Sequence, residues 1–226
     1  MEMIILQNSL KMLQDRGVNI DIYETVLTYT TDNLPAYVDY LKRSENNTFA
    51  YLVVKRACNS KKIPFSDRLA LSYKIDDILV MFVDIENKLV SKDMISLCSG
   101  LALEQQIKNL IIVGPNIPSA DGKNALITVK EKYIFQYFKD EELYSRPLEY
   151  IWSCKYEIFT KEQTDKFISE NNFTVAQIPR LFTTDPIIKW MGAKAGIIVK
   201  EINSSFLPGT IVKEDFSYRY LIEEKG

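Results

Sequence analysis

Apolar residues at the start of the chain repeat with the period of an α-helix. Between residues 3 and 13 they are spaced by three and four positions, which places them on one helical face. These residues are Met3, Leu6, Leu10 and Leu13. Gly17 follows Arg16 and suits the end of a helix. A second helix is predicted to begin at Thr31 or Asp32, with Pro35 in its first turn.

Four apolar segments further along are predicted to be β-strands. They are residues 48–54, 78–83, 110–113 and 133–138. The two middle segments are continuously apolar, which is typical of strands covered on both faces. Ser91 is the expected start of a helix towards Leu97, and residues 101–107 either extend that helix or form another. Alternation of helix and buried strand predicts an α/β layer domain.

The pattern changes after Arg146 and Pro147. Short apolar runs now alternate with turn residues, among them Asp185-Pro186 and Gly192. The sequence therefore predicts two domains, residues 1–146 and residues 147–226. From Arg146 onward, acidic and basic residues balance. This balance suits a protein-docking unit better than a phosphate-binding one.

Composition excludes several classes of function. Histidine is absent from the 226 residues, which rules out Ser-His-Asp and Cys-His catalysis. Cys58, Cys98 and Cys154 form no C-x-x-C pair, so zinc-ribbon spacing is absent. A formal net charge of −2 argues against a free-standing nucleic-acid binder. No apolar run approaches the roughly 18 residues of a membrane span, and the start lacks the basic flank of a signal peptide.

Four short motifs follow one another at fixed spacing in the second domain. They are Gln-Ile-Pro-Arg-Leu at 177–181, Asp-Pro-Ile-Ile-Lys-Trp-Met-Gly at 185–192, Lys-Ala-Gly at 194–196 and Val-Lys at 199–200. In this order they resemble the C-terminal assembly module of the fifth subunit of eukaryotic and viral DNA-dependent RNA polymerases, and the corresponding small subunit of archaeal RNA polymerases. Residues 12–17 and 132–143 resemble the same family, so the resemblance covers essentially the whole chain.

The resemblance implies a fold and a role. The expected fold is an α/β N-terminal jaw domain of nuclease-like topology, without activity, followed by a small α+β C-terminal assembly domain that binds the largest polymerase subunit. The expected function is that of a non-catalytic structural subunit of a multisubunit DNA-directed RNA polymerase, with the jaw near downstream duplex DNA. Neither a cofactor nor a membrane is expected. The expected location is the nucleus or, for a viral protein, a cytoplasmic viral factory or virion, and an Asn-, Lys- and Ile-rich composition suggests an AT-rich genome such as that of a parasite or a large DNA virus.

Two sets of contact residues are implied by the same resemblance. The partner-binding set comprises Gln177, Pro179, Arg180, Asp185, Pro186, Lys189, Trp190, Gly192, Lys194, Gly196, Lys200, Tyr218 and Arg219. A DNA-proximal loop is expected at residues 114–123, as an exposed tip, with Pro118, Ser119 and Lys123 as candidate contacts. Where the family has Thr-Pro-Ser-Ala, this chain has Ile-Pro-Ser-Ala at residues 117–120, so the first hydroxyl is missing.

Several of these residues also have a plain structural interpretation. Asp185 and Pro186 suit a turn before the next element, and Gly192 and Gly196 suit turns with positive φ. Trp190 is expected either to fill the core of the module or to anchor an interface pocket. The lysines are expected to be solvated, or to meet acidic groups of the large subunit or a phosphate.

Two regions depart from the family pattern. Tyr150, Cys154 and Tyr156 stand where the family has two histidines and a proline, and residues 203–209 stand for its Arg-Pro-Ser-Glu-Thr-Ala-Gly turn. The partner surface is therefore expected to have diverged.

One motif favours a different class of protein. Asp84 and the Glu-Asn-Lys at residues 86–88 mimic the carboxylates and E-x-K of nucleases that hold Mg²⁺. The two carboxylates lie only two positions apart on one strand end, so an exposed hairpin turn is the favoured interpretation. A nuclease-like DNA-processing enzyme remains the alternative function, and a free-standing adaptor that uses the same module is a third.

Overall fold

The chain divides into two compact units, Met1–Ser145 and Arg146–Gly226. The computed structural model describes residues 3–21, 69–75, 77–84, 90, 92–104, 106–150, 155–204 and 214–224. Each unit has its own four-stranded sheet. The helix predicted from residue 31 or 32, the strand predicted at residues 48–54 and the Glu-Asn-Lys at residues 86–88 lie outside the described residues.

The N-terminal unit has a mixed sheet in the order β1-β2-β3-β4. The strands are β1 (Leu69–Ile75), β2 (Ile78–Asp84), β3 (Asn109–Gly114) and β4 (Ile134–Lys139). Strand β1 is antiparallel to β2, whereas β2, β3 and β4 are parallel. Parallel neighbours need crossover connections, and the helices α5 (Lys92–Glu104) and α6 (Ala120–Lys132) follow β2 and β3 in the chain. The strands predicted at residues 78–83 and 110–113 are confirmed, and residues 101–104 extend the preceding helix.

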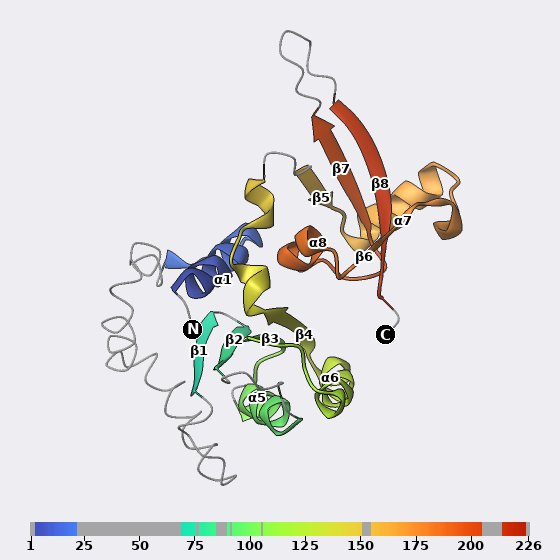
Figure 1. Cartoon of the computed structure of the whole chain (residues 1–226). Helices are drawn as coiled ribbons and strands as arrows, with labels where there is room; N and C mark the ends of the chain where they lie inside the picture. The colour runs from blue at the N-terminus through green and yellow to red at the C-terminus, as the bar shows by residue number, and fades with distance from the viewer. Residues whose placement is uncertain are drawn as a thin grey trace. The chain divides into compact units, whose positions relative to one another are not determined.

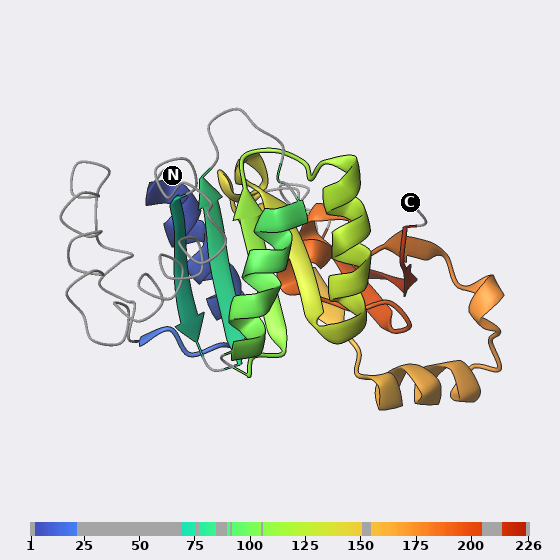
Figure 2. The same cartoon turned by 90° about the horizontal axis from the view of Figure 1, so that it is seen from below.

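Helices cover both faces of this sheet. Figures 1 and 2 show α5 and α6 side by side on one face and α1 (Met3–Asp15) on the other. On the α5 side, Met81 and Ile112 pack in one buried cluster with Met94 and Cys98. The predicted first helix is confirmed, and the positive φ of Gly17, 81°, follows its end. On α1, the amide Nδ2 of Asn8 donates to the carbonyl of Leu143 at 2.8 Å, which ties the helix to the 3₁₀ turn Asp140–Leu143 after β4.

The C-terminal unit has a sheet in the order β5-β7-β8-β6. The strands are β5 (Lys155–Ile158), β6 (Arg180–Phe182), β7 (Ile198–Ser204) and β8 (Glu214–Ile222). Its helices are α7 (Lys161–Glu170) and α8 (Pro186–Met191), with 3₁₀ turns at Pro147–Glu149 and Val175–Gln177. Strand β8 lies between β7, to which it is antiparallel, and β6, to which it is parallel. In Figure 1, β7 and β8 extend beyond the shorter outer strands.

The two helices of this unit pack on opposite faces of its sheet. Ile188 of α8 joins Val199 and Leu221 in a buried cluster. Tyr218 pairs in register with Lys200, the neighbour of Val199, so its side chain lies on the other face. There it contacts Phe167 of α7, with ring centroids 4.5 Å apart.

Among the described helices of the chain, none has the length and apolar character that a membrane crossing requires.

Candidate assembly surface and β3–α6 loop

The Asp-Pro motif starts a short helix. Asp185 is the N-cap of α8, and its Oδ1 accepts from the backbone N–H groups of Ile187 and Ile188 at 3.0 and 3.2 Å. Pro186 occupies the first helical turn, where a missing N–H has no cost. Gly192 ends the helix with φ 70°, the left-handed conformation that glycine adopts without steric penalty. These motif residues therefore determine backbone geometry.

Trp190 and Gly196 also have structural positions. Trp190 is only 1% exposed, as the core interpretation predicts, so its ring does not form part of the surface. Gly196 has φ 91°, and its N–H donates to the carbonyl of Leu221 at 2.9 Å. The positive φ expected for Gly192 and Gly196 is confirmed.

The first motif lies on the exposed segment before β6. Gln177 Oε1 accepts from the backbone N–H and from the hydroxyl of Thr174, at 2.7 and 2.9 Å, so this side chain closes the turn Val175–Gln177. The carbonyl of Pro179 accepts from the N–H of Tyr220 at 2.8 Å and extends the pairing of β6 with β8. Arg180 is exposed and has no ion pair within the described part of the chain.

The three lysines of the motifs have different surroundings. Lys189 is half-buried on α8, and Lys194 is exposed after it. Lys200 is half-buried on β7, with its Nζ 3.4 Å from Glu157 Oε2 and 4.4 Å from the ring centroid of Phe216. Lys200 is thus engaged within the unit, while Lys194 makes no ion pair among the described residues.

Arg219 is held by a buried carboxylate. Its Nε donates to Glu201 Oε2 at 3.1 Å, and the hydroxyl of Ser217 donates to the same oxygen at 2.6 Å. The side chain of Glu201 is 10% exposed, whereas that of Arg219 is 39% exposed. Among the described residues the ion pair uses Nε only, so the two terminal nitrogens of the guanidinium can make a bidentate contact. Glu201 thus orients the guanidinium of Arg219 and leaves its terminal N–H groups outside this ion pair.

The motif residues on the strands lie on both faces of the sheet. Cross-strand partners share a sheet face, so Arg180, Lys200 and Tyr218 lie on the face that α7 covers, and Arg219 lies on the face of Val199. Sequence reasoning missed Glu201. Its signal was an acid next to Lys200 in β7, two positions after the buried Val199.

The predicted exposed loop at residues 114–123 is wrong in extent. Helix α6 begins at Ala120, so Lys123 is exposed on its first turn and the connection from β3 comprises residues 115–119 only, the β3–α6 loop. Ser119 is the N-cap, with its Oγ accepting from the N–H of Gly122 at 3.1 Å. Pro118 is buried and bridges to Val90. Ser119 favours an N-cap, and that preference outweighs the glycine at 122 that suggested a loop.

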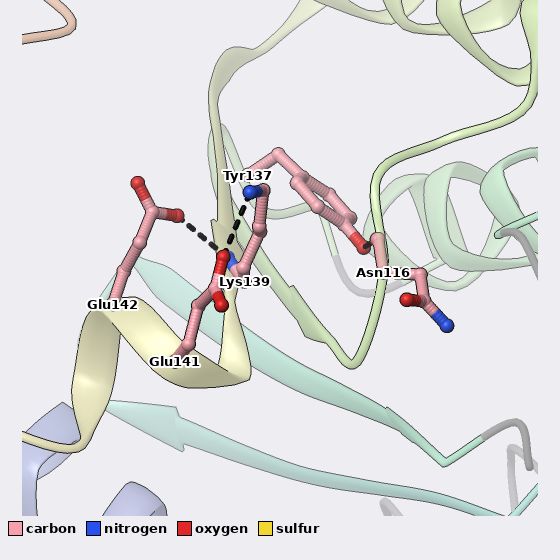
Figure 3. Close-up of polar contacts among 5 residues, drawn as sticks. All are labelled: Asn116, Tyr137, Lys139, Glu141 and Glu142. Atoms are coloured by element: carbon pink, nitrogen blue, oxygen red, sulfur yellow. Dashed lines mark hydrogen bonds and ion pairs between the residues drawn. The ribbon is translucent and has the colours of Figure 1, made fainter. Parts of the chain in front are cut away.

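Polar contacts surround the end of β4, next to the loop (Figure 3). The hydroxyl of Tyr137 donates to the carbonyl of Asn116. The N–H of Lys139 donates to Glu142 at 2.7 Å, and its Nζ pairs with Glu141 at 2.8 Å. The hydrogen bond that the Lys139 ammonium donates to Glu141 is the main cause that raises the pKa of Lys139. Sequence reasoning missed Tyr137, because no pattern links it to residue 116.

The nuclease-like motif cannot be assembled from the described residues. Asp84 ends β2, and the residues that follow it up to 89 lie outside the described part. Within the described ranges no group of three His, Cys, Asp or Glu side chains could hold a metal ion.

Comparison with known proteins identifies the family. Residues 146–221 match the family described as RNA polymerase Rpb5, C-terminal domain. The DNA-directed RNA polymerases I, II, and III subunit RPABC1 of Caenorhabditis briggsae is 24% identical over 147 residues, which cover 65% of this chain and 67% of that protein. The DNA-directed RNA polymerase subunit Rpo5 of Methanocaldococcus jannaschii is 32% identical over 69 residues, 30% of this chain and 83% of the archaeal protein. Rpo5 of Sulfurisphaera tokodaii is 37% identical over 68 residues, 30% of this chain and 76% of that protein. The resemblance inferred from the motifs is confirmed, and the chain belongs to the Rpb5/Rpo5 family of RNA polymerase subunits.

Proposed function

We propose that this chain is a non-catalytic structural subunit of a multisubunit DNA-directed RNA polymerase. The observation that carries this proposal is the coincidence of the matched residues 146–221 with the compact unit Arg146–Gly226. Relatives across the match are polymerase subunits, so the alternative of a nuclease is set aside.

The C-terminal unit is the assembly module, and its partner is the largest polymerase subunit. The Rpo5 proteins support this assignment because the matched stretch covers most of their length, 83% in Methanocaldococcus jannaschii. A module of this size is therefore sufficient for membership of a polymerase. The partner site is expected to include acidic side chains that meet Arg180, Lys194 and the outer edge of Arg219.

The N-terminal unit is the jaw, with a nuclease-like topology and no activity, and it steadies downstream duplex DNA within the assembled enzyme. The family resemblance of residues 12–17 and 132–143 supports this role. With a net charge of −2 over the whole chain, the contact with DNA depends on the other subunits. The nucleus is the proposed location, since relatives named above include subunits of the eukaryotic polymerases I, II and III, and those relatives lend no support to a viral factory.

Affinity purification of the tagged full chain tests the assembly role. The largest polymerase subunit should co-purify, and the double variant Arg180→Glu, Lys194→Glu should weaken its recovery. The matched control is Lys166→Glu, on the exposed surface of α7, where the side chain is 72% exposed. Recovery of the chain without any polymerase subunit would overturn the proposal. Equal losses from the double variant and the control would show that the acidic partner site lies elsewhere.

A further inference from the structure

The β3–α6 loop, residues 115–119, is tied to the sheet by contacts from distant parts of the chain. Pro118 forms a bridge with Val90, and the N–H of Ser119 donates to the carbonyl of Val90 at 3.0 Å. On the other side, the hydroxyl of Tyr137 donates to the carbonyl of Asn116. The loop is thus fastened near its start by β4 and at its end by residue 90.

The ring of Tyr137 fits this position because β3 ends in glycine. A Cβ atom on Gly114 would lie 2.7 Å from the Tyr137 hydroxyl oxygen and 3.3 Å from Cγ2 of Val90. Any larger residue at 114 would therefore displace the hydroxyl from the loop. The absence of a side chain at Gly114 thus makes room for the Tyr137 hydroxyl.

The hydroxyl is chemically suited to a permanent donor role. Burial is the main cause that raises the pKa of Tyr137, and the nearby carboxylates of Asp140 and Glu142 raise it further. The group therefore stays protonated at physiological pH and can always donate. A carbonyl such as that of Asn116 can only accept, so the contact has one direction.

The tied loop presents a defined surface. Ile117 is 49% exposed, and Figure 3 shows the side chain of Asn116 directed away from Tyr137. Where the family pattern has a threonine, Ile117 has no hydroxyl to hold the loop from within. The hydroxyl of Tyr137 holds the loop at Asn116, and the hydroxyl of Ser119 caps the helix that follows the loop.

We propose that Tyr137 is the positioning residue of the jaw, because its hydroxyl fixes the β3–α6 loop in the form that Asn116 and Ile117 present to the backbone of downstream duplex DNA. This inference rests on the proposed jaw function. The hydroxyl acts through the loop and does not itself touch DNA.

Hydrogen exchange on the full chain within the purified polymerase tests the tie. In Tyr137→Phe, the amide of Ser119 should exchange on the order of fivefold faster, the factor expected for loss of one hydrogen bond. The matched control is Tyr133→Phe, because the Tyr133 hydroxyl also donates to a backbone carbonyl, that of Ser99 at 3.2 Å. Equal exchange of Ser119 in the variant and the control would overturn the proposal.

A second variant keeps the hydroxyl but moves it. Gly114→Ala should push the Tyr137 hydroxyl off Asn116 and should also speed exchange at Ser119. Gly100→Ala, with open space around residue 100, is the control and should leave Ser119 unchanged. Unaltered exchange in Gly114→Ala would show that the hydroxyl is not what holds the loop.

Crosslinking separates this inference from the jaw function. A photoreactive side chain at residue 117 of the assembled enzyme should reach one narrow set of downstream template positions. In Tyr137→Phe the same probe should spread over more positions or lose at least half its yield, whereas Tyr133→Phe should match the parent. An unchanged pattern in Tyr137→Phe overturns the positioning role. Absence of DNA crosslinks in the parent overturns the jaw contact and the DNA part of this inference, while the exchange result still decides whether Tyr137 holds the loop.

Discussion

The chain turns into a helix at the start of α8 and at the start of α6, but the contacts that hold the two turns span different sequence distances. At α8, the N-cap Asp185 and the end residue Gly192 act within a few residues of the turns that they close. At α6, the Ser119 cap is local, but the loop before it depends on Val90 and Tyr137. The first segment lies in the part that matches the family and is locally encoded, whereas the second is held from elsewhere in the sheet. A motif that is easy to recognise thus reports backbone geometry more directly than it reports contacts with a partner.

The largest effect should come from the buried tryptophan of the locally encoded segment. Trp190→Ala should lower the free energy of unfolding of the C-terminal unit by about 3–5 kcal/mol, because a large side chain that is 1% exposed leaves a cavity. Exchange rates of the β7 and β8 amides would measure this loss. Phe182→Ala is the control, since Phe182 is 47% exposed, and it should cost far less. Similar losses in both variants would contradict the core position of Trp190.

A smaller effect should follow from removing the cation that faces Glu201. Arg219→Ala should destabilise the C-terminal unit by about 1–3 kcal/mol, since it leaves a buried carboxylate with one donor fewer. The expected loss of stability is small because the Arg219 side chain is partly exposed and solvent screens its charge.

The double variant Arg219→Ala, Glu201→Gln should recover part of that stability, because a neutral amide is cheaper to bury than a charge. Urea unfolding of the parent, Arg219→Ala, Glu201→Gln and the double variant would give the coupling energy of the pair. Additive losses would show that Glu201 and Arg219 do not interact energetically.

Alanine substitution at two glycines should change the free energy of unfolding in opposite directions. Gly192→Ala places a Cβ in a left-handed conformation, φ 70°, and should cost about 1–2 kcal/mol. Gly100 lies inside α5, and apart from the backbone of its own helix no atom would contact an added Cβ, so Gly100→Ala should stabilise its unit by about 0.5–1 kcal/mol. Thermal unfolding of the two variants would measure both shifts. The same sign for both would refute the assigned role of Gly192.

The smallest effect is expected on the exposed face of α7. Hydrogen bonding to Asp165 raises the pKa of Lys161, so any stabilisation is fully present at neutral pH and is lost as the pH rises through the lysine range. Because both side chains are exposed, Lys161→Met should leave the melting temperature at neutral pH unchanged within error. If the melting temperature of Lys161→Met fell clearly, and added salt did not reduce the difference, the Lys161–Asp165 pair would contribute more to stability than an exposed ion pair does.

Sequence reasoning was most successful where structure is determined locally. The apolar runs around Leu79 and Leu110, the helix that begins at Met3 and the positive φ of Gly192 and Gly196 are all set by neighbours within a few positions. It failed at residues 114–123, where Pro115, Pro118 and Gly122 suggested a longer loop, although Ser119 begins a helix.

The candidate site was harder to predict than the fold. The expected partner contacts of Gln177, Asp185 and Gly192 stay predictions, and within the unit their side chains or backbones close turns. Glu201 and Tyr137 were missed, because their partners lie at least sixteen positions away in the sequence. Pairings of that range arise from sheet register, which composition and periodicity do not specify.

The position of β8 in the sheet bears on the order of events during protein synthesis. This strand is made after β5, β6 and β7, yet it lies between β7 and β6, and Arg180 of β6 pairs with Tyr220. The sheet of the C-terminal unit therefore cannot close until residues 214–222 have left the ribosome. By then the N-terminal unit, whose strands are complete at Lys139, has had time to fold. The proposed jaw is thus expected to mature first, and engagement of a partner by the proposed assembly module is the last step.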